Sequence, residues 1–336
     1  MAGFAVVDMQ TTGLFAGYPS SIVEIAVVQT TAEGQIESTW SSLVRPIAPF
    51  DAHAHGITPD AVAGAPTFAE VAPTLVEKLE GRALAGHERA FVAAFLTAAF
   101  TAIGYAAPIS PETTVCTMCM VHKFFPDKAK RSLAACCAEA GIPIPPARTA
   151  LDEAVAAARL LQHYLAEASA TTRPWQRPWS PMLAAAAVTA WPALPHLAGP
   201  VPSLPRDAST AERGTTFLAH LVEALPDRPG FGQTTYLARL DRALTDARFG
   251  TFEQQRLAIA AGVEGLDLAT VHRLHEEYLH DLARIATEEC GVLDDAQLCE
   301  LNGAAGLLGF GPGDVDDALF TAQEARRRRT RLTAVA

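Results

Sequence analysis

The chain has 336 residues, 49% of them hydrophobic and 19% charged, so it is long enough for two globular domains with separate cores. Its net charge of −11 argues against a protein that coats nucleic acid non-specifically, because phosphate binding draws on lysine and arginine. No apolar run has the length of a membrane span and no signal peptide is recognised, so we expect a cytoplasmic protein with no membrane partner.

The six cysteines, at positions 116, 119, 136, 137, 290 and 299, follow no regular framework. We therefore expect reduced thiols. Cys116 and Cys119 form a C-x-x-C pair, but no second cysteine or histidine pair lies at zinc-finger spacing. A structural role is favoured over metal binding for this pair.

The first half of the chain alternates between strand and helix patterns. Runs or alternations of apolar residues predict strands at 4–8, 22–30, 36–45, 82–86 and around Val115. Amphipathic or Ala-rich segments predict helices at 67–80, 89–103, 133–139 and 149–168. Three consecutive strands followed by alternating helices and strands predict an α/β domain over residues 1–168, with a mixed sheet covered by helices.

A Pro-rich segment follows. Residues 171–205 contain eight prolines and three of the four tryptophans, which predicts a semi-rigid connector over 169–210 that packs along a domain. We expect one short helix in it, at 183–190.

The second half is helical throughout. We predict an all-α domain over 211–325, with helices at 211–225, 234–247, 251–261, 267–289, 294–308 and 312–325. Residues 326–336 form a basic tail, for which a solvated disordered terminus is favoured over a nucleic-acid-binding arm.

The strand that ends in Asp8 continues as Asp8-Met9-Gln10-Thr11-Thr12-Gly13. This segment resembles the first motif, D-x-E-T-T-G, of the DEDDh (DnaQ-like) 3′→5′ exonucleases, with Gln10 in place of the glutamate. Residues 22–28 resemble the family's second strand, and 55–59 with 64–68 resemble a further family segment. The resemblance covers residues 3–166 and implies a ribonuclease-H-like fold.

Two further motifs resemble the family with substitutions. Residues 87–96 read H-E-R-A-F-V-A-A-F-L where the family has H-N-A-x-F-D-x-x-F-L, so Val92 replaces a metal-binding aspartate. Residues 148–154 read R-T-A-L-D-E-A where the family has H-R-A-L-x-D-A. Arg148 therefore replaces the general-base histidine, and Glu153 replaces the last aspartate.

The resemblance implies a site that has lost most of its chemistry. The family holds two divalent metals between four carboxylates, and its histidine activates water. The equivalent positions here are Asp8, Gln10, Val92, Arg148 and Glu153. Asp8 and Glu153 are the remaining metal ligands, so we expect no cofactor or a single Mg or Mn ion. Arginine cannot act as a base, although Arg148 could hold a phosphate.

Residues near these motifs are candidates for binding nucleic acid or another ligand. They are Thr11, Thr12, Gly13, His55, His87, Glu88, Phe91 and Arg148. His87, Glu88 or Asp152 could also replace lost metal ligands. The alternative is that His87 is a loop residue and that Glu88 and Asp152 are solvated acids at helix starts.

The helical half resembles the TerB-like tellurite-resistance module over residues 236–244, 279–286, 291–298 and 307–309. Asp294-Asp295 predicts a helix cap, because the calcium-loop pattern is absent. His272 and His275 could chelate a metal, but a surface pair is favoured.

The leading functional hypothesis is a non-catalytic exonuclease-fold protein that binds a single-stranded nucleic-acid end, a nucleotide or a protein partner. Three alternatives stay open. One is an active 3′→5′ exonuclease with a reduced metal site, and another is a fold repurposed for a small-molecule reaction in a pocket lined by Val92 and Gln10. The last is a scaffold whose helical half binds a protein partner.

Overall fold

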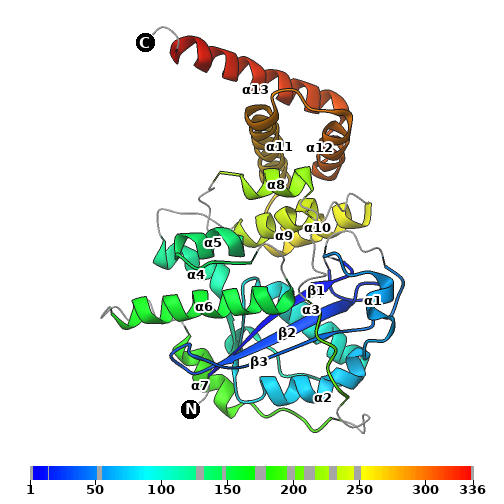
Figure 1. Cartoon of the computed structure of the whole chain (residues 1–336), viewed down its shortest axis with the longest axis vertical. Helices are drawn as coiled ribbons and strands as arrows, with labels where there is room; N and C mark the ends of the chain where they lie inside the picture. Colours follow the sequence, from blue (N-terminus) through cyan, green and yellow to red (C-terminus); the bar gives the residue numbers. More distant parts are fainter. Residues whose placement is uncertain are drawn as a thin grey trace. The chain divides into compact units, whose positions relative to one another are not determined.

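The computed structural model describes residues 3–13, 15–50, 55–125, 132–145, 149–170, 179–194, 201–207, 216–226, 233–245 and 251–333. The chain divides into two compact units, Met1–Arg213 and Gly214–Ala336 (Figure 1). None of the helices in the described ranges is both long enough and apolar enough to cross a membrane.

A five-stranded mixed sheet forms the centre of the first unit. Its strands are β1 (Phe4–Thr11), β2 (Ile22–Thr30), β3 (Ile36–Leu43), β4 (Ala83–Gly86) and β5 (Thr114–Cys116), in the order β3-β2-β1-β4-β5. The pairs β1–β2 and β2–β3 are antiparallel, whereas β1–β4 and β4–β5 are parallel. This topology confirms the predicted ribonuclease-H-like mixed sheet.

Helices cover both faces of the sheet, which explains why β1 and β2 are almost continuously apolar. Phe4 and Val6 of β1 belong to the core on the face covered by α6 (Ala150–Ser169). Ala5 and Val7 belong to the core on the opposite face, which contains side chains of α2 (Phe68–Leu79) and α3 (Arg89–Ala102). Figure 1 shows α6 running along one side of the strands.

The helix starts follow local capping chemistry. The Thr67 backbone N–H donates to the Glu70 carboxylate at 2.7 Å at the start of α2, and Thr149 and Asp152 make the same contact at 3.0 Å at the start of α6. The predicted helix α5 (Leu133–Glu139) is confirmed. Three short helices were not predicted: α1 (Pro59–Ala63), the 3₁₀ turn η1 (Pro111–Thr113) and α4 (Thr117–Phe124).

The described parts of the Pro-rich connector pack against the first unit. They contain α7 (Ser180–Val188) and the buried Trp179. The Tyr105 hydroxyl donates to the Pro192 carbonyl at 2.8 Å. Further along, the Leu43 backbone N–H donates to the Leu204 carbonyl at 2.7 Å, beside the edge strand β3. The connector therefore supplies part of the first unit's fold, in agreement with the expectation drawn from its tryptophans.

The second unit is all-α in the ranges described. Its helices are α8 (Phe217–Glu223), α9 (Thr234–Thr245), α10 (Thr251–Val263), α11 (Leu268–Cys290), α12 (Asp295–Leu308) and α13 (Pro312–Thr333). Asp294 caps α12 as predicted, because its Oδ1 accepts from the Gln297 backbone N–H at 2.8 Å. The prediction of a surface histidine pair was wrong for His275, which is buried with 8% exposure.

The expectation of a disordered basic terminus was also wrong, since α13 continues through the arginine run as far as Thr333. The end of α11 provides partners for this part of α13. The Arg326 guanidinium donates to the Thr287 carbonyl, and Arg329 Nη2 lies 2.6 Å from Glu288 Oε1. Cations beside the last carbonyls of a helix are favoured by its dipole.

Candidate functional site

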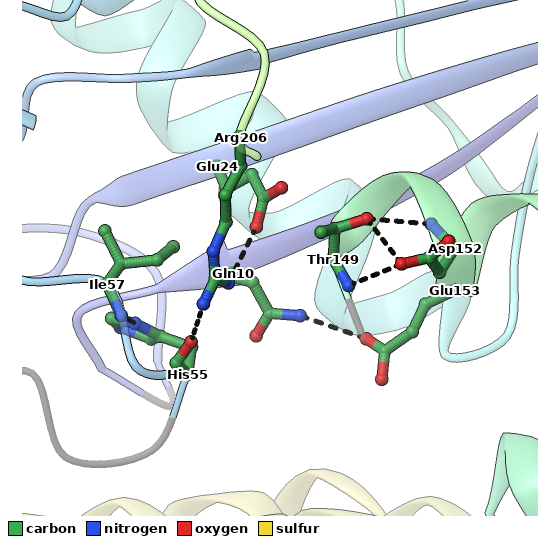
Figure 2. A network of polar contacts seen from close by, with 8 residues as sticks. All are labelled: Gln10, Glu24, His55, Ile57, Thr149, Asp152, Glu153 and Arg206. Atoms are coloured by element: carbon green, nitrogen blue, oxygen red, sulfur yellow. Dashed lines mark hydrogen bonds and ion pairs between the residues drawn. The ribbon is translucent and has the colours of Figure 1, made fainter. Parts of the chain in front are cut away.

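Two family-equivalent residues come together although 143 positions separate them in the sequence. Gln10 lies near the end of β1, and Glu153 lies in the first turn of α6. Gln10 Nε2 donates a hydrogen bond to Glu153 Oε2 at 3.0 Å, as Figure 2 shows. Because a carboxylate only accepts hydrogen bonds, the NH₂ group of Gln10 must face it. The Gln10 amide therefore occupies the Glu153 oxygen that a metal ion would need as a ligand.

The unchanged Asp8 lies two residues before Gln10 on β1. It is buried, with 9% of its surface exposed, and pairs in register with Ala26 of β2. Two residues before Ala26 on β2 lies Glu24, which pairs in register with Gln10. Glu24 is 1% exposed and lies in the segment that resembles the family's second strand, outside the five site positions. The antiparallel pairing thus places a further carboxylate beside the site.

Arg206 neutralises this carboxylate. Its Nη1 lies 3.4 Å from Glu24 Oε2, and both side chains are almost fully buried. Its Nη2 donates to the His55 carbonyl at 2.7 Å. The Ile57 backbone N–H in turn donates to His55 Nδ1 at 3.1 Å, so this ring nitrogen carries no proton. Arg206 therefore joins the connector, β2 and the segment around His55 (Figure 2).

Burial dominates the electrostatics of Glu24. Desolvation raises the pKa of its carboxyl above the ordinary 4.5, and the nearby charge of Glu153 acts in the same direction. The positive charge of Arg206 and a hydrogen bond from the Ala150 backbone oppose this rise in pKa. The group thus depends on a partner 182 residues away to stay ionised inside the protein.

Val92 is part of the hydrophobic core. It is 3% exposed on α3, among the side chains that cover one face of the sheet. A Cβ placed on Gly86 would lie 3.0 Å from Val92 Cγ2, so the end of β4 and the start of α3 are closely packed. The position that the family motif gives to a metal-binding aspartate therefore holds hydrocarbon in a tight contact.

The residues between β4 and α3 are more buried than their sequence suggested. Glu88 is 8% exposed, so the alternative of a solvated acid is wrong for this residue. His87 is half-buried, and its Nδ1 lies 3.0 Å from Thr117 Oγ1. Asp152 is a helix-start acid as expected, because its carboxylate accepts from both the backbone and the hydroxyl of Thr149.

The other predicted ligand-binding residues have local structural contacts. Thr11 Oγ1 donates to the Gly13 carbonyl at 2.6 Å, and Thr12 Oγ1 accepts from the Ser21 backbone N–H at 2.8 Å. Phe91 is buried, with its ring centroid 4.6 Å from that of Phe95. Arg148 lies outside the described residues, so its proposed phosphate contact stays a prediction.

The donor set does not fit the two-metal centre of the family. Two metals need several oxygen ligands, but Gln10 turns its NH₂ group toward Glu153 and Val92 offers no ligand atom. Across the described ranges, no group of three His, Cys, Asp or Glu side chains is arranged to hold a metal ion. Asp8 and Glu153 remain the predicted ligands for a single ion.

Sequence reasoning missed Glu24 and Arg206. Glu24 interrupts an otherwise apolar buried strand, which was a usable signal, since such positions rarely hold a charge without a partner. Arg206 carried no comparable signal, because it lies in a Pro-rich connector. Its role follows from the path of the connector back to the sheet.

Comparisons with known proteins bear on the family of the first unit. The family model described as Exonuclease (RNase_T) matches residues 5–161. A DNA polymerase III subunit epsilon-like protein of Rhodobacter capsulatus is 37% identical over 97 residues, which are 28% of this chain and 14% of that protein. A PolC-type DNA polymerase III of Latilactobacillus sakei is 33% identical over 102 residues, 30% of this chain and 7% of that protein.

The chain thus aligns with only a small part of these relatives. Among solved structures, the nuclease domain of 3'hExo, a DEDDh family member bound to rAMP, matches with a TM-score of 0.41 and 19% identity. That match covers 49% of this chain and 92% of the other. The TerB-like resemblance of the second unit stays a prediction. Residues 5–161 are therefore a domain of the Exonuclease (RNase_T) family, with DnaQ-like relatives.

Proposed function

We propose that the exonuclease-fold unit binds a single-stranded nucleic-acid end without cleaving it. The observation that carries this proposal is the 3.0 Å hydrogen bond from Gln10 Nε2 to Glu153 Oε2. In a working site of this family, both positions would present carboxylate oxygens to metal ions. Here the two side chains are bonded to each other, which supports a binding role in place of two-metal hydrolysis.

Charge supports the same proposal. A nucleic-acid end brings phosphate, which is repelled by uncompensated carboxylates unless metal ions lie between them. Gln10 and Val92 remove two such charges, and Arg206 pairs with the carboxylate of Glu24 beside the site. The predicted contact between Arg148 and a phosphate would add a cation at the same end of α6.

A matched pair of proteins tests the proposal. The wild-type chain is compared with the rebuilt variant Gln10→Glu, Val92→Asp, Arg148→His and Glu153→Asp. Fluorescence anisotropy with a labelled single strand measures binding, and a denaturing gel measures shortening of the strand in Mg²⁺ or Mn²⁺. We expect the wild type to bind and to leave the strand intact, and the rebuilt variant to shorten it.

The control is Asp8→Ala in the rebuilt protein, which should abolish the shortening. The binding proposal fails if the wild type shows no anisotropy change with single-stranded DNA or RNA at low salt. Salt titration then distinguishes phosphate contacts from others, because binding through phosphates weakens as the salt concentration rises.

A second candidate function is a slow exonuclease with a reduced metal site. The burial of Glu88 and Asp8, which are 8% and 9% exposed, favours it, because two carboxylates of the first unit are held out of bulk solvent. Shortening of the strand by the wild-type chain that both Asp8→Ala and Glu88→Gln abolish would establish this activity and overturn the non-catalytic proposal.

A further inference from the structure

Two thiols meet at the start of α4, away from the positions of the family motif. β5 ends at Cys116, which is the cap residue of α4, and Cys119 is the third residue of that helix. A side-chain hydrogen bond joins the two cysteines. Their sulfur atoms are therefore neighbours, and the spacing of a helix cap and third residue is one that a disulfide can bridge.

The two thiols differ in access. Cys116 is 6% exposed, and its Sγ donates to the His87 carbonyl at 3.3 Å. Cys119 is exposed. A reagent from solution therefore meets Cys119 first, while Cys116 is buried and hydrogen-bonded to it.

The surroundings favour a thiolate on Cys116. The pKa of Cys116 is lowered from 9.0 to about 7, with the hydrogen bond from the Cys119 side chain as the largest cause and burial opposing it. A backbone hydrogen bond at Arg89, a second from Cys119 and the positive charge of Arg89 act in the same direction. Cys137 is a useful contrast, since burial alone raises the pKa of its thiol to about 12.

We propose that Cys116 and Cys119 are a modification site, which forms a reversible intramolecular disulfide by exchange with a low-molecular-weight disulfide such as oxidised glutathione. Metal binding by this pair is disfavoured. In the part of the chain that the structure describes, no group of three His, Cys, Asp or Glu side chains is arranged to hold a metal ion. This inference does not depend on the proposed function.

The exchange proceeds in two steps. Cys119 loses its proton to solvent, and its sulfur attacks one sulfur of oxidised glutathione, which breaks that disulfide and releases one glutathione thiolate. The Cys116 thiolate then attacks the Cys119 sulfur of the mixed disulfide, which releases the second glutathione thiolate. Both thiolates take up protons, so two protein thiols are oxidised and one glutathione disulfide is reduced to two thiols.

The site is coupled to the segment between β4 and α3. Cys116 pairs in register with Gly86, and in its thiol form it donates a hydrogen bond to the His87 carbonyl. The ring of His87 in turn contacts the hydroxyl of Thr117, the residue after Cys116. Disulfide formation removes the thiol proton, so the hydrogen bond to His87 is lost at the start of the loop that leads to Val92.

The experiment uses the full chain, first reduced and then treated with oxidised glutathione. After an acid quench, free thiols are labelled with N-ethylmaleimide and the protein is digested with trypsin. The peptide 90–123 contains Cys116 and Cys119 and no other cysteine. The peptide 285–326 contains Cys290 and Cys299 and is the matched control.

We expect peptide 90–123 to lose two hydrogen atoms, to take no label, and to recover both labels after treatment with dithiothreitol. It should be oxidised about tenfold faster at neutral pH than the control peptide, because the lowered pKa of Cys116 supplies the thiolate that closes the mixed disulfide. Two labels on peptide 90–123, or a glutathione adduct that persists on Cys119, overturns the proposal.

Cys119→Ser is the decisive variant, because it changes an exposed side chain and leaves the buried Cys116 in place. It should retain one labelled cysteine and raise the pH at which Cys116 reacts. Arg89→Gln should raise that pH by a smaller amount. If neither variant changes the pH profile of labelling, the assigned environment of Cys116 is wrong.

Discussion

The two units bury polar groups in different ways. In the first unit, Glu24 and Arg206 form a buried ion pair between residues 182 positions apart. In the second unit, the buried group compared with this pair is the neutral side chain of His275. His275 Nε2 lies 2.6 Å from the Tyr236 hydroxyl, and His275 Nδ1 lies 2.8 Å from the Leu308 carbonyl. A carbonyl only accepts, so Nδ1 carries the proton and Nε2 accepts from Tyr236.

This difference shows what each kind of burial requires. An ionised group inside a protein needs a counter-charge at a fixed place, which here comes from a connector that returns to the sheet. A neutral histidine needs only one donor and one acceptor, and neighbouring helices supply both. The ion pair therefore makes the first unit depend on its connector, whereas the second unit's network is internal to its helices.

Removal of the counter-charge should have the largest effect. Arg206→Met leaves Glu24 buried without its cation, and we expect a loss of about 3–5 kcal/mol in the free energy of unfolding. Urea denaturation followed by tryptophan fluorescence measures it, since all four tryptophans belong to the first unit's part of the chain.

The double variant Glu24→Gln with Arg206→Met should recover much of this stability, because it leaves no buried charge. A control is Arg273→Met in the second unit, which breaks an exposed ion pair with Glu277 and, followed by far-ultraviolet circular dichroism, should cost only about 0.3–0.5 kcal/mol. Equal costs for Arg206→Met and Arg273→Met would contradict the buried pair.

The neutral network should be less sensitive. Tyr236→Phe removes the donor to His275 Nε2 and leaves a buried acceptor unsatisfied, at an expected cost of about 1–3 kcal/mol. The far-ultraviolet circular dichroism of the helical unit during denaturation measures the loss. A stability equal to that of the wild type would show that Tyr236 does not serve as the donor to this histidine.

The smallest effects are those of pH, and they have opposite signs in the two units. Burial lowers the pKa of His275 below 6.5. The unfolded chain then binds more protons than the folded one, so stability falls as the pH drops from 6.5 toward the folded pKa. The pKa of Glu24 is raised above 4.5, so its folded form binds more protons, and stability falls as the pH rises from 4.5 toward the folded pKa.

Denaturation at a series of pH values checks both signs. His275→Gln should remove the loss of stability below pH 6.5 from the helical transition, and His280→Gln, at an exposed position on the same helix, should leave it unchanged. Glu24→Gln should remove the opposite slope from the tryptophan signal. The same slope in both transitions would show that the two burial environments do not differ as described.

The local elements were predictable because their causes are local. The strands β1 to β3, the helices α2, α3, α5 and α6, and the cap at Asp294 follow from runs of apolar residues and from capping side chains. The short helices α1 and α4 were missed, since so few residues leave little periodicity to read. The helical path of α13 through the arginines was missed because its partners lie on α11.

The sequence by itself determined the mixed sheet, the family resemblance and the altered motif positions, because these are properties of contiguous residues. Only the tertiary structure decided that Gln10 donates to Glu153, that Arg206 neutralises Glu24, and that His275 is buried. Each of these contacts joins residues far apart in the chain, or depends on how helices pack. The physical reason is that hydrogen bonding and desolvation act between neighbours in space, which spacing along the sequence does not specify.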